Sequence, residues 1–309
     1  MNQHVSMRDW IQLHLVILAW GITGVLGKIM SLPAVEVVIW RTALAACGLA
    51  VLATFLRAGL RLAPAMALRF IGNGVLVGAH WILFFLSVRL GNVSVCMAAL
   101  PTTMLWCSLL EPLFDRNKRI SKTELLTGVL MVSSVWLIFS VEFTHWQGFA
   151  AGLGAAFVGA LFAVINKRIA TTEHFAVISC YQMIGACLAG LIALPFFADG
   201  GTLFHKPVTR DVFSLLVLSQ VCTVGAYTAY IHVLRRMSVF TVNVFYNLEP
   251  IYGIILAALI FGDTERMSTG FYIGTGIILA TVIVLPFVNR RMSKKTANST
   301  DPPAASGLP

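Results

Sequence analysis

The chain has 309 residues, of which 58% are hydrophobic and only 11% are charged. Soluble domains devote about a quarter of their residues to charged side chains, so a water-soluble fold is excluded. The formal net charge of +9 does not require nucleic acid as a partner, because basic residues beside a membrane face anionic lipid.

The apolar residues form runs of about 20 residues, which is the length that one helix needs to cross a bilayer. Short polar connections separate the runs. The first run follows Arg8, but it is too long for a signal peptide and no small-residue cleavage site follows it. The sequence therefore predicts an all-α integral membrane protein with ten transmembrane helices, at residues 12–30, 34–56, 69–88, 93–114, 124–141, 148–166, 174–197, 212–234, 239–261 and 268–288.

Positive charge alternates between the two sides of this ten-helix map. Most of the 22 Lys and Arg residues fall in segments on one side when both termini are placed on that side. Cytoplasmic loops retain Lys and Arg, so both termini are expected in the cytoplasm. An odd number of helices would scramble the alternation. We expect an integral protein of a bacterial inner or plasma membrane.

Two stretches, 93–135 and 242–282, carry the same signals in the same order. Each has a proline, an apolar stretch, a charged turn and a glycine in the next helix. These signals are Pro101, 116–121 and Gly128 in the first stretch, and Pro250, 263–268 and Gly274 in the second. Leu-Glu-Pro at 110–112 and at 248–250 also match, but at a conflicting register, and we favour the pairing of Pro101 with Pro250.

The repeat divides the chain into two units of five helices, 12–141 and 148–288. Because five is odd, equivalent helices would cross the membrane in opposite directions. Such inverted repeats are typical of secondary carriers, whose sites lie near the midplane between the halves. Residues 293–309 lack apolar periodicity and are expected to form a disordered cytoplasmic tail.

A set of short motifs resembles the EamA-type branch of the drug/metabolite transporter superfamily over residues 10–290. The motifs are Trp20-Gly21, Arg41, His80-Trp81, the two proline, charged-turn and glycine patterns, Asn247 to Gly253, and Gly262-Asp263. The resemblance implies two inverted EamA repeats and a central cavity lined mainly by helices 1–4 and 6–9. Members export or exchange amino acids, other metabolites and drugs. The family usually has Gly-Glu where this chain has Gly262-Asp263, which we interpret as a turn element.

Ionisable residues inside the expected spans are functional candidates, because an unpaired charge at membrane depth is costly. Glu249 precedes Pro250 in mid-span, where the proline breaks the helix beside a carboxylate; a role with substrate or proton and a buried structural role both remain open. Glu111 suits an interfacial ion pair with Arg116 or Lys118, and Arg41 suits snorkelling or a pair with Glu36. For His80 we favour a hydrogen-bonded structural role over proton transfer.

Aromatic and amide side chains at membrane depth are the other candidates, since such rings normally lie at the membrane interfaces. With His80 and Glu249, the expected substrate cavity consists of Trp20, Trp81, Trp106, Tyr181, Tyr227, Tyr246 and Asn247. Asn166, Gln182, Gln220 and Asn243 also need polar partners. The six cysteines lie in apolar runs without CxxC or metal-ligand spacing, so we expect small core residues, no metal and no cofactor.

These patterns favour a carrier that moves a small metabolite or amphipathic compound by alternating access, with export or exchange implied by the resemblance. Its expected partners are a small-molecule substrate and the lipid bilayer, and it works as a monomer or homodimer. A ligand-binding receptor or scaffold without transport is the alternative. An enzyme is less favoured, because the sequence has no HExxH, no GxSxG, no P-loop lysine and no pair of intramembrane aspartates.

Overall fold

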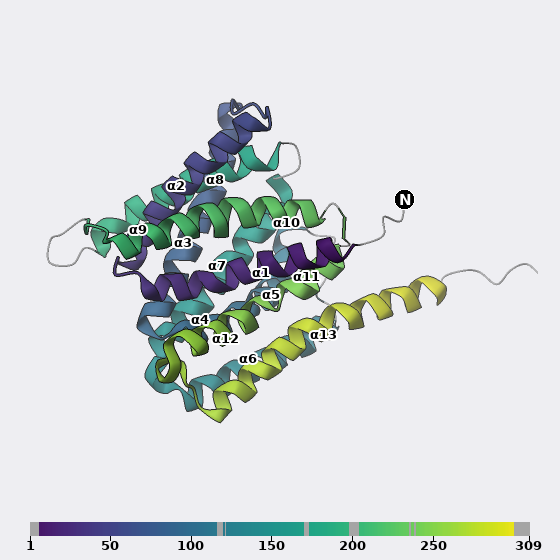
Figure 1. Ribbon diagram of the computed structural model, residues 1–309. Helices are drawn as coiled ribbons and strands as arrows, with labels where there is room; N and C mark the ends of the chain where they lie inside the picture. Colours follow the sequence, from purple (N-terminus) through teal and green to yellow (C-terminus); the bar gives the residue numbers. More distant parts are fainter. Residues whose placement is uncertain are drawn as a thin grey trace, which may run out of the picture.

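The computed structural model describes residues 6–115, 120, 122–169, 173–197, 204–234, 236–237 and 239–299. This part of the chain consists of helices and their connections (Figure 1). The first half contains α1 (Met7–Ile29), α2 (Ala34–Phe55), α3 (Pro64–Leu90), α4 (Val93–Ala99), the 3-10 turn η1 (Leu100–Thr102), α5 (Thr103–Phe114) and α6 (Lys122–Val141). The second half contains η2 (Phe143–His145), α7 (Trp146–Ile169), α8 (Phe175–Ala193), η3 (Leu194–Phe196), α9 (Thr209–Leu216), the π-helix η4 (Val217–Gly225), α10 (Ala226–Leu234), α11 (Val239–Tyr246), α12 (Glu249–Phe261), η5 (Gly262–Glu265) and α13 (Thr269–Ser299).

Each expected span overlaps one helix or a run of consecutive helices. By length and composition, seven helices of the described residues are able to cross a membrane. These are Met7–Ile29, Ala34–Phe55, Pro64–Leu90, Val93–Phe114, Phe143–Ile169, Phe175–Phe196 and Thr209–Val233. The apolar helices Leu126–Val141 and Thr269–Val284 are shorter, and two turn residues separate α11 from α12.

Large apolar side chains cover the outside of the bundle. Trp136 on α6 is 70% exposed, and Leu259 on α12 is 78% exposed. A soluble monomer rarely exposes apolar patches of this extent, whereas hydrocarbon solvates them without cost. The exposed surface therefore agrees with the composition and suits a lipid environment.

Helices of the two halves interleave. The main contacts join α3 to α7 and α8, α1 to α12 and α10, α5 to α7, α2 to α8 and η4, and α6 to α13. Figure 1 places α6 and α13 along one edge of the bundle and α2 and α8 along the opposite edge. Exchanging each first-half helix for its second-half equivalent converts this set of contacts into itself; for example, α1 with α12 becomes α7 with α5. The two sequence repeats thus build one body with an approximate twofold pattern.

The two prolines that align the repeats both interrupt a helix. Pro101 lies in the 3-10 turn between α4 and α5, and Pro250 follows the turn between α11 and α12. Both breaks come about two turns after the helix begins. This correspondence agrees with the pairing of Pro101 with Pro250.

The C-terminal boundary differs from the expectation. The sequence predicts that residues 293–299 belong to a disordered tail, but α13 continues to Ser299. The reason is local: Arg290, Arg291, Met292, Lys294 and Lys295 all favour helix, so the helix extends beyond its apolar part. Residues 300–309 of the expected tail lie outside the described residues.

Candidate functional site

The break before Pro250 places Glu249 at the first position of α12. α11 ends at Tyr246, residues 247–248 form a turn, and α12 starts at Glu249. The predicted mid-span break is therefore confirmed. A carboxylate at this position faces the positive end of the α12 dipole.

α1 passes directly beside this break. A Cβ atom on Gly21 would lie 3.2 Å from the carbonyl oxygen of Glu249 and 3.2 Å from the backbone nitrogen of Gly253. Contacts this tight would require the neighbouring backbone to shift by a few tenths of an ångström, so glycine suits the close approach of the two helices. The Trp20-Gly21 pair thus brings the first half against the backbone of the first turn of α12, where Glu249 lies.

Aromatic rings surround the same place. The ring centroid of Trp20 lies 5.3 Å from that of Tyr230 and 5.4 Å from that of Tyr246, and Tyr227 follows at 6.4 Å from Tyr230. Tyr246 ends α11, three residues before Glu249. Trp20, Tyr227 and Tyr246 of the predicted residues thus form one aromatic cluster with Tyr230, and Tyr246 brings this cluster to the break before Glu249.

Arg41 enters this region from α2. Its side chain is 3% exposed, its Nε donates to Thr223 Oγ1 at 3.1 Å, and its Cζ lies 3.7 Å from the ring centroid of Trp81. Its Nη1 is buried and has no hydrogen-bond partner among the described residues. Arg41 thus points into the bundle, and the expected snorkelling is wrong.

The expected pair of Arg41 with Glu36 is also wrong. Glu36 accepts from the backbone nitrogen of His205 at 3.0 Å and contacts its Nδ1 at 2.6 Å. Glu36 and Arg41 are five positions apart on one helix, so the two side chains leave α2 on different faces.

Neither Arg41 nor Glu249 has an ion-pair partner within 4.0 Å among the described residues. We call Arg41, Trp81, Thr223, Tyr246 and Glu249 the polar centre. It combines one buried cation from the first half with one carboxylate from the second half. The polar centre is therefore suited to bind a ligand group of positive or of negative charge.

The π-helix η4 is the part of this site that the sequence did not reveal. Thr223 donates to the carbonyl oxygen of Leu218, five residues earlier, at 2.8 Å, while Gln220 donates to the carbonyl oxygen of Leu44 on α2 at 2.9 Å. π-helical segments often occur at functional sites. The sequence marks Gln220 only as a polar residue at membrane depth, and Thr223 gives no signal because a threonine can satisfy its own helix.

His80 has a structural partner. Its Nδ1 lies 2.7 Å from the carbonyl oxygen of Ala155 on α7, as the favoured interpretation required. Trp106 packs its ring against Phe157, with centroids 5.3 Å apart, and its buried Nε1 has no partner among the described residues.

The remaining predicted residues are distributed over the molecule. Tyr181 donates to the carbonyl oxygen of Leu60, at the connection between α2 and α3, at 2.9 Å. Glu111 pairs with Lys167 at 3.1 Å, and both side chains are partly exposed; Arg116 and Lys118, its expected partners, lie outside the described residues. Asn247 occupies the turn before Glu249.

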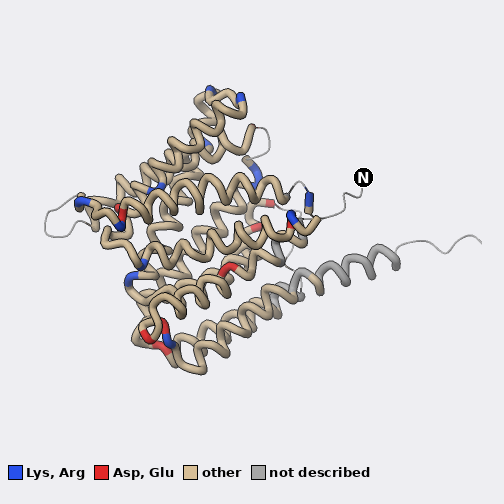
Figure 2. The backbone as a smooth tube through the Cα atoms, viewed as in Figure 1, with Lys and Arg blue, Asp and Glu red and all other residues tan. Residues whose placement is uncertain are grey.

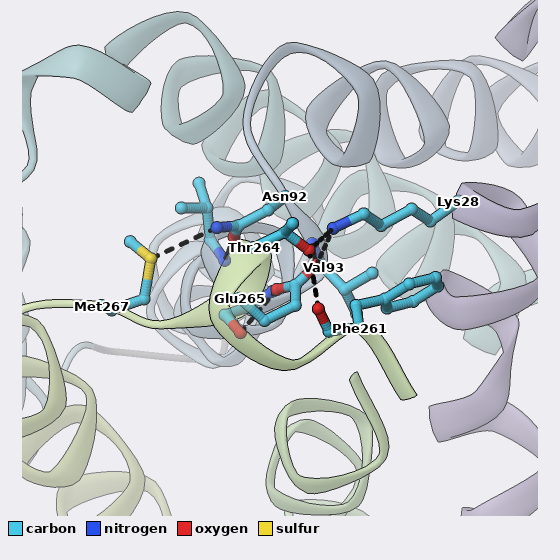
Figure 3. Close-up of polar contacts among 9 residues, drawn as sticks. Lys28, Asn92, Val93, Phe261, Thr264, Glu265 and Met267 are labelled. Carbon is cyan, nitrogen blue, oxygen red and sulfur yellow. Dashed lines mark hydrogen bonds and ion pairs between the residues drawn. The ribbon is translucent and has the colours of Figure 1, made fainter. Parts of the chain in front are cut away.

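A second polar cluster joins the halves where α1 and α12 end (Figure 3). Glu265, which is fully buried, accepts from Lys28 Nζ at 2.8 Å, from the backbone nitrogens of Val93 and Ser94 at 3.0 and 2.9 Å, and from Ser94 Oγ at 2.8 Å. Figure 3 shows Lys28 reaching Glu265 and Thr264 beside the ring of Phe261. Asp263, which precedes Thr264 in the same turn, is 95% exposed at its side chain.

An apolar groove of about 710 Å³ lies elsewhere, along the N-terminal part of α1. It is lined by Met7, Trp10, Ile11, His14, Leu15, Leu18, Phe245 and Tyr252. The groove does not include the polar centre. His14 Nδ1 and the Tyr252 hydroxyl group, 2.7 Å apart, are the polar contact in its lining.

Charged residues otherwise gather at the ends of helices, and Figure 2 shows long uncharged segments between those ends. Ends rich in charge, apolar middles and an apolar exterior together define a polytopic α-helical integral membrane protein.

The EamA-like transporter family model matches this chain twice, at residues 10–140 and 146–287. The chain belongs to this family. It is also 25% identical over 155 residues to an uncharacterized transporter of Clostridium kluyveri, covering 50% of this chain and 49% of the relative; the chain thus spans about half the length of that relative. A solved crystal structure shares the fold, with a TM-score of 0.63 and 14% identity over 92% of this chain and 99% of the other.

Proposed function

We propose that the protein is a secondary carrier that moves a small metabolite or amphipathic compound across the cytoplasmic membrane by alternating access. The observation that carries the proposal is the polar centre, in which Arg41 of one half and Glu249 of the other both lie at membrane depth without an ion-pair partner among the described residues. Charges held at membrane depth without an ion pair are costly, and a carrier uses such charges to bind its substrate or coupling ion.

The architecture of this carrier has ten spans, arranged as two inverted repeats of five helices, with both termini in the cytoplasm. The interleaved contacts of the halves support this arrangement, because rocking one half against the other exposes a site between them to each side in turn. Trp20, Tyr230, Tyr246 and Glu249 line the site with Arg41 and Trp81. The resemblance of this chain to the family favours export or exchange over uptake.

The test is counterflow in proteoliposomes that contain the purified full-length protein. Vesicles loaded with unlabelled amino acids, sugars, nucleosides or cationic drugs are diluted into the labelled compound. We expect saturable accumulation for one class, lost in Glu249→Gln and kept in the exposed control Asp263→Asn. Tight ligand binding without counterflow for any compound would contradict the carrier and favour the receptor alternative.

A further inference from the structure

The apolar groove along α1 opens on the outside of the bundle. One of its walls is a stripe of aliphatic side chains about one turn apart on α1, which are between 40% and 74% exposed: Met7, Ile11, Leu15 and Leu18. The other wall is aromatic. Phe245 on α11 and Tyr252 on α12 come from the two sides of the helix break, and the ring centroid of Trp10 lies 4.9 Å from that of Phe245. The groove is therefore a concave surface that hydrocarbon can enter.

The lining of the groove suits a hydrocarbon chain better than a polar ligand. His14 Nδ1 and the Tyr252 hydroxyl group are 2.7 Å apart, so these two polar groups already have each other as partners. Apart from this pair and Trp10, the lining side chains carry no N–H or O–H group. A ligand that fills the groove gains mainly by apolar contact.

The length of the groove matches one leaflet of a bilayer. α1 rises about 16 Å from Met7 to Leu18, at about 1.5 Å per residue. The hydrocarbon core of a bilayer is about 30 Å thick, so one leaflet contributes about 15 Å. Met7 lies in the first turn of α1, which places one end of the groove at the membrane surface. In the topology proposed above, this is the inner surface.

Two exposed cations stand at that end of the groove. Arg236 Nη1 lies 3.3 Å from Asp9 Oδ1 on α1, with its side chain 48% exposed, and Arg8 in the same turn of α1 is exposed. Asp9 itself is buried and also accepts from the backbone nitrogen and the Oγ of Ser6, both at 2.8 Å. The accessible charge at this end is therefore positive, which complements a phosphate group.

We propose that the groove binds one anionic phospholipid of the inner leaflet. One acyl chain lies between α1 and the break that separates α11 from α12, and the phosphate lies at Arg8 and Arg236. The cytoplasmic leaflet carries anionic lipids, and basic pockets between transmembrane helices on that side bind their head groups. The proposal rests on the proposed topology and is independent of the polar centre. A bound lipid would join α1 to both sides of the break, because Phe245 precedes the break and Tyr252 follows it.

Native mass spectrometry of the detergent-purified full-length protein tests the proposal. Palmitoyl-oleoyl phosphatidylglycerol is compared with phosphatidylcholine of the same two chains at equal concentration. We expect one phosphatidylglycerol per protein chain, retained about fivefold or more over phosphatidylcholine, and a higher Tm in its presence. Glycerol phosphate, which has the charge without the acyl chains, should not raise Tm. Equal retention of the two lipids, or equal stabilisation by glycerol phosphate, would overturn the proposal.

Matched variants separate the head-group contact from general attraction to positive charge. Arg8→Gln combined with Arg236→Gln should lower retention of phosphatidylglycerol several-fold, to the level of phosphatidylcholine. The control is Arg61→Gln combined with Arg69→Gln, which removes two exposed cations at the start of α3 and in the connection before it and should keep the preference. Equal loss in the two double variants would overturn the proposal.

A second pair of variants tests the groove and leaves every charge in place. Leu15→Trp fills the groove and should lower retention of phosphatidylglycerol several-fold, whereas Leu126→Trp, at a 61% exposed position on α6, should keep it. Unchanged retention in Leu15→Trp would overturn the proposal. A protein dimer that Leu15→Trp abolishes, without any lipid adduct, would assign the groove to a second copy of the chain and would also overturn it.

Discussion

Glu265 illustrates how a charge can be fully buried and still contribute to stability. Its carboxylate accepts hydrogen bonds from the backbone nitrogens of Val93 and Ser94, from Ser94 Oγ and from Lys28, with no exposure of the residue. It therefore caps the first turn of α4 from the other half of the chain. Asn92 caps the same turn by accepting from the Val95 backbone nitrogen.

We expect Glu265→Gln to destabilise the protein. The amide replaces one acceptor oxygen with a donor that faces backbone N–H groups and removes the negative charge that pairs with Lys28, which together cost about 2–4 kcal/mol. Thermal unfolding of the detergent-purified protein, followed by tryptophan fluorescence, should show a clearly lower Tm. Asp263→Asn, which alters an exposed pair with Arg266, should change Tm little. Equal Tm values for the two variants would contradict the role of Glu265.

The sequence could predict a single site residue where a charged side chain stands next to a residue that breaks a helix. Glu249 stood out because a carboxylate precedes a proline within an apolar run. Glu36 and His205 could not be paired from the sequence, because 169 positions separate them and only the folded chain brings them together. Glu265 falls within the charged turn at 263–268, and nothing local in the sequence points to its partners, since Lys28, Val93 and Ser94 belong to the opposite half.

Among the elements, the crossing of α3 and α8 depends on glycine. A Cβ atom on Gly74 would overlap the backbone carbonyl of Gln182, and one on Gly185 would overlap that of Ile71. Backbone atoms inside two packed helices cannot move aside as a flexible side chain can. The two helices thus touch at their backbones, which is the usual means of close packing in membranes.

We expect Gly74→Ala to destabilise the protein strongly, with loss of folded material or a large fall in Tm, because α3 and α8 must separate. Gly72→Ala on the same helix is the matched control, since nothing lies within 4 Å of its added Cβ. Replacing glycine by alanine within a helix is itself favourable by about 1 kcal/mol, so this control should be unchanged or slightly more stable. Size-exclusion profiles and thermal unfolding separate the two results; similar behaviour of both variants would show that the crossing tolerates a methyl group.

Hydropathy located these elements because lipid solvation imposes long apolar runs. It could not predict the π-helix at residues 217–225, since hydropathy reports the length of an apolar run and not the hydrogen-bond spacing within it. Nor could it show that α1 approaches α12 at Gly21, because glycines on many helix faces look alike. The candidate site depends on both the π-helix and the close approach at Gly21, so the sequence alone could not predict its geometry.

At the scale of the whole molecule, the two ends of the bundle are joined differently. Where α1 ends and α2 begins, the links between halves use buried carboxylates: Lys28 with Glu265, Ser31 with Asp211 and His205 with Glu36. At the opposite end, Asp9 is also buried and pairs with Arg236, whereas Glu111, whose side chain is 32% exposed, pairs with Lys167. The first end therefore has the larger share of links through buried carboxylates among the described residues. Polar contacts through a buried carboxylate hold the two halves together more firmly than contacts through an exposed one. In the proposed topology, the firmly joined end is the outer one.

We therefore expect Lys28→Met to open the outer end. The variant leaves Glu265 bonded to the N-terminus of α4 but removes its tie to α1, so the halves separate more readily. The readout is the labelling of Tyr246→Cys by a membrane-impermeant maleimide applied from outside to right-side-out vesicles, in a background where the exposed Cys47 is replaced by Ala. The label should react slowly when Lys28 is retained and several-fold faster in the Lys28→Met variant.

Lys167→Met is the control for this labelling, because it removes an exposed pair at the other end of the bundle and should leave outer access unchanged. In alternating access, one side of the carrier closes as the other side opens. Cys at position 246 in the Lys28→Met variant should therefore react more slowly with maleimide applied to the inner side, in inverted vesicles. Faster labelling from both sides would instead mean that the halves have loosened as a whole, and Lys28 would then stabilise the fold without controlling access.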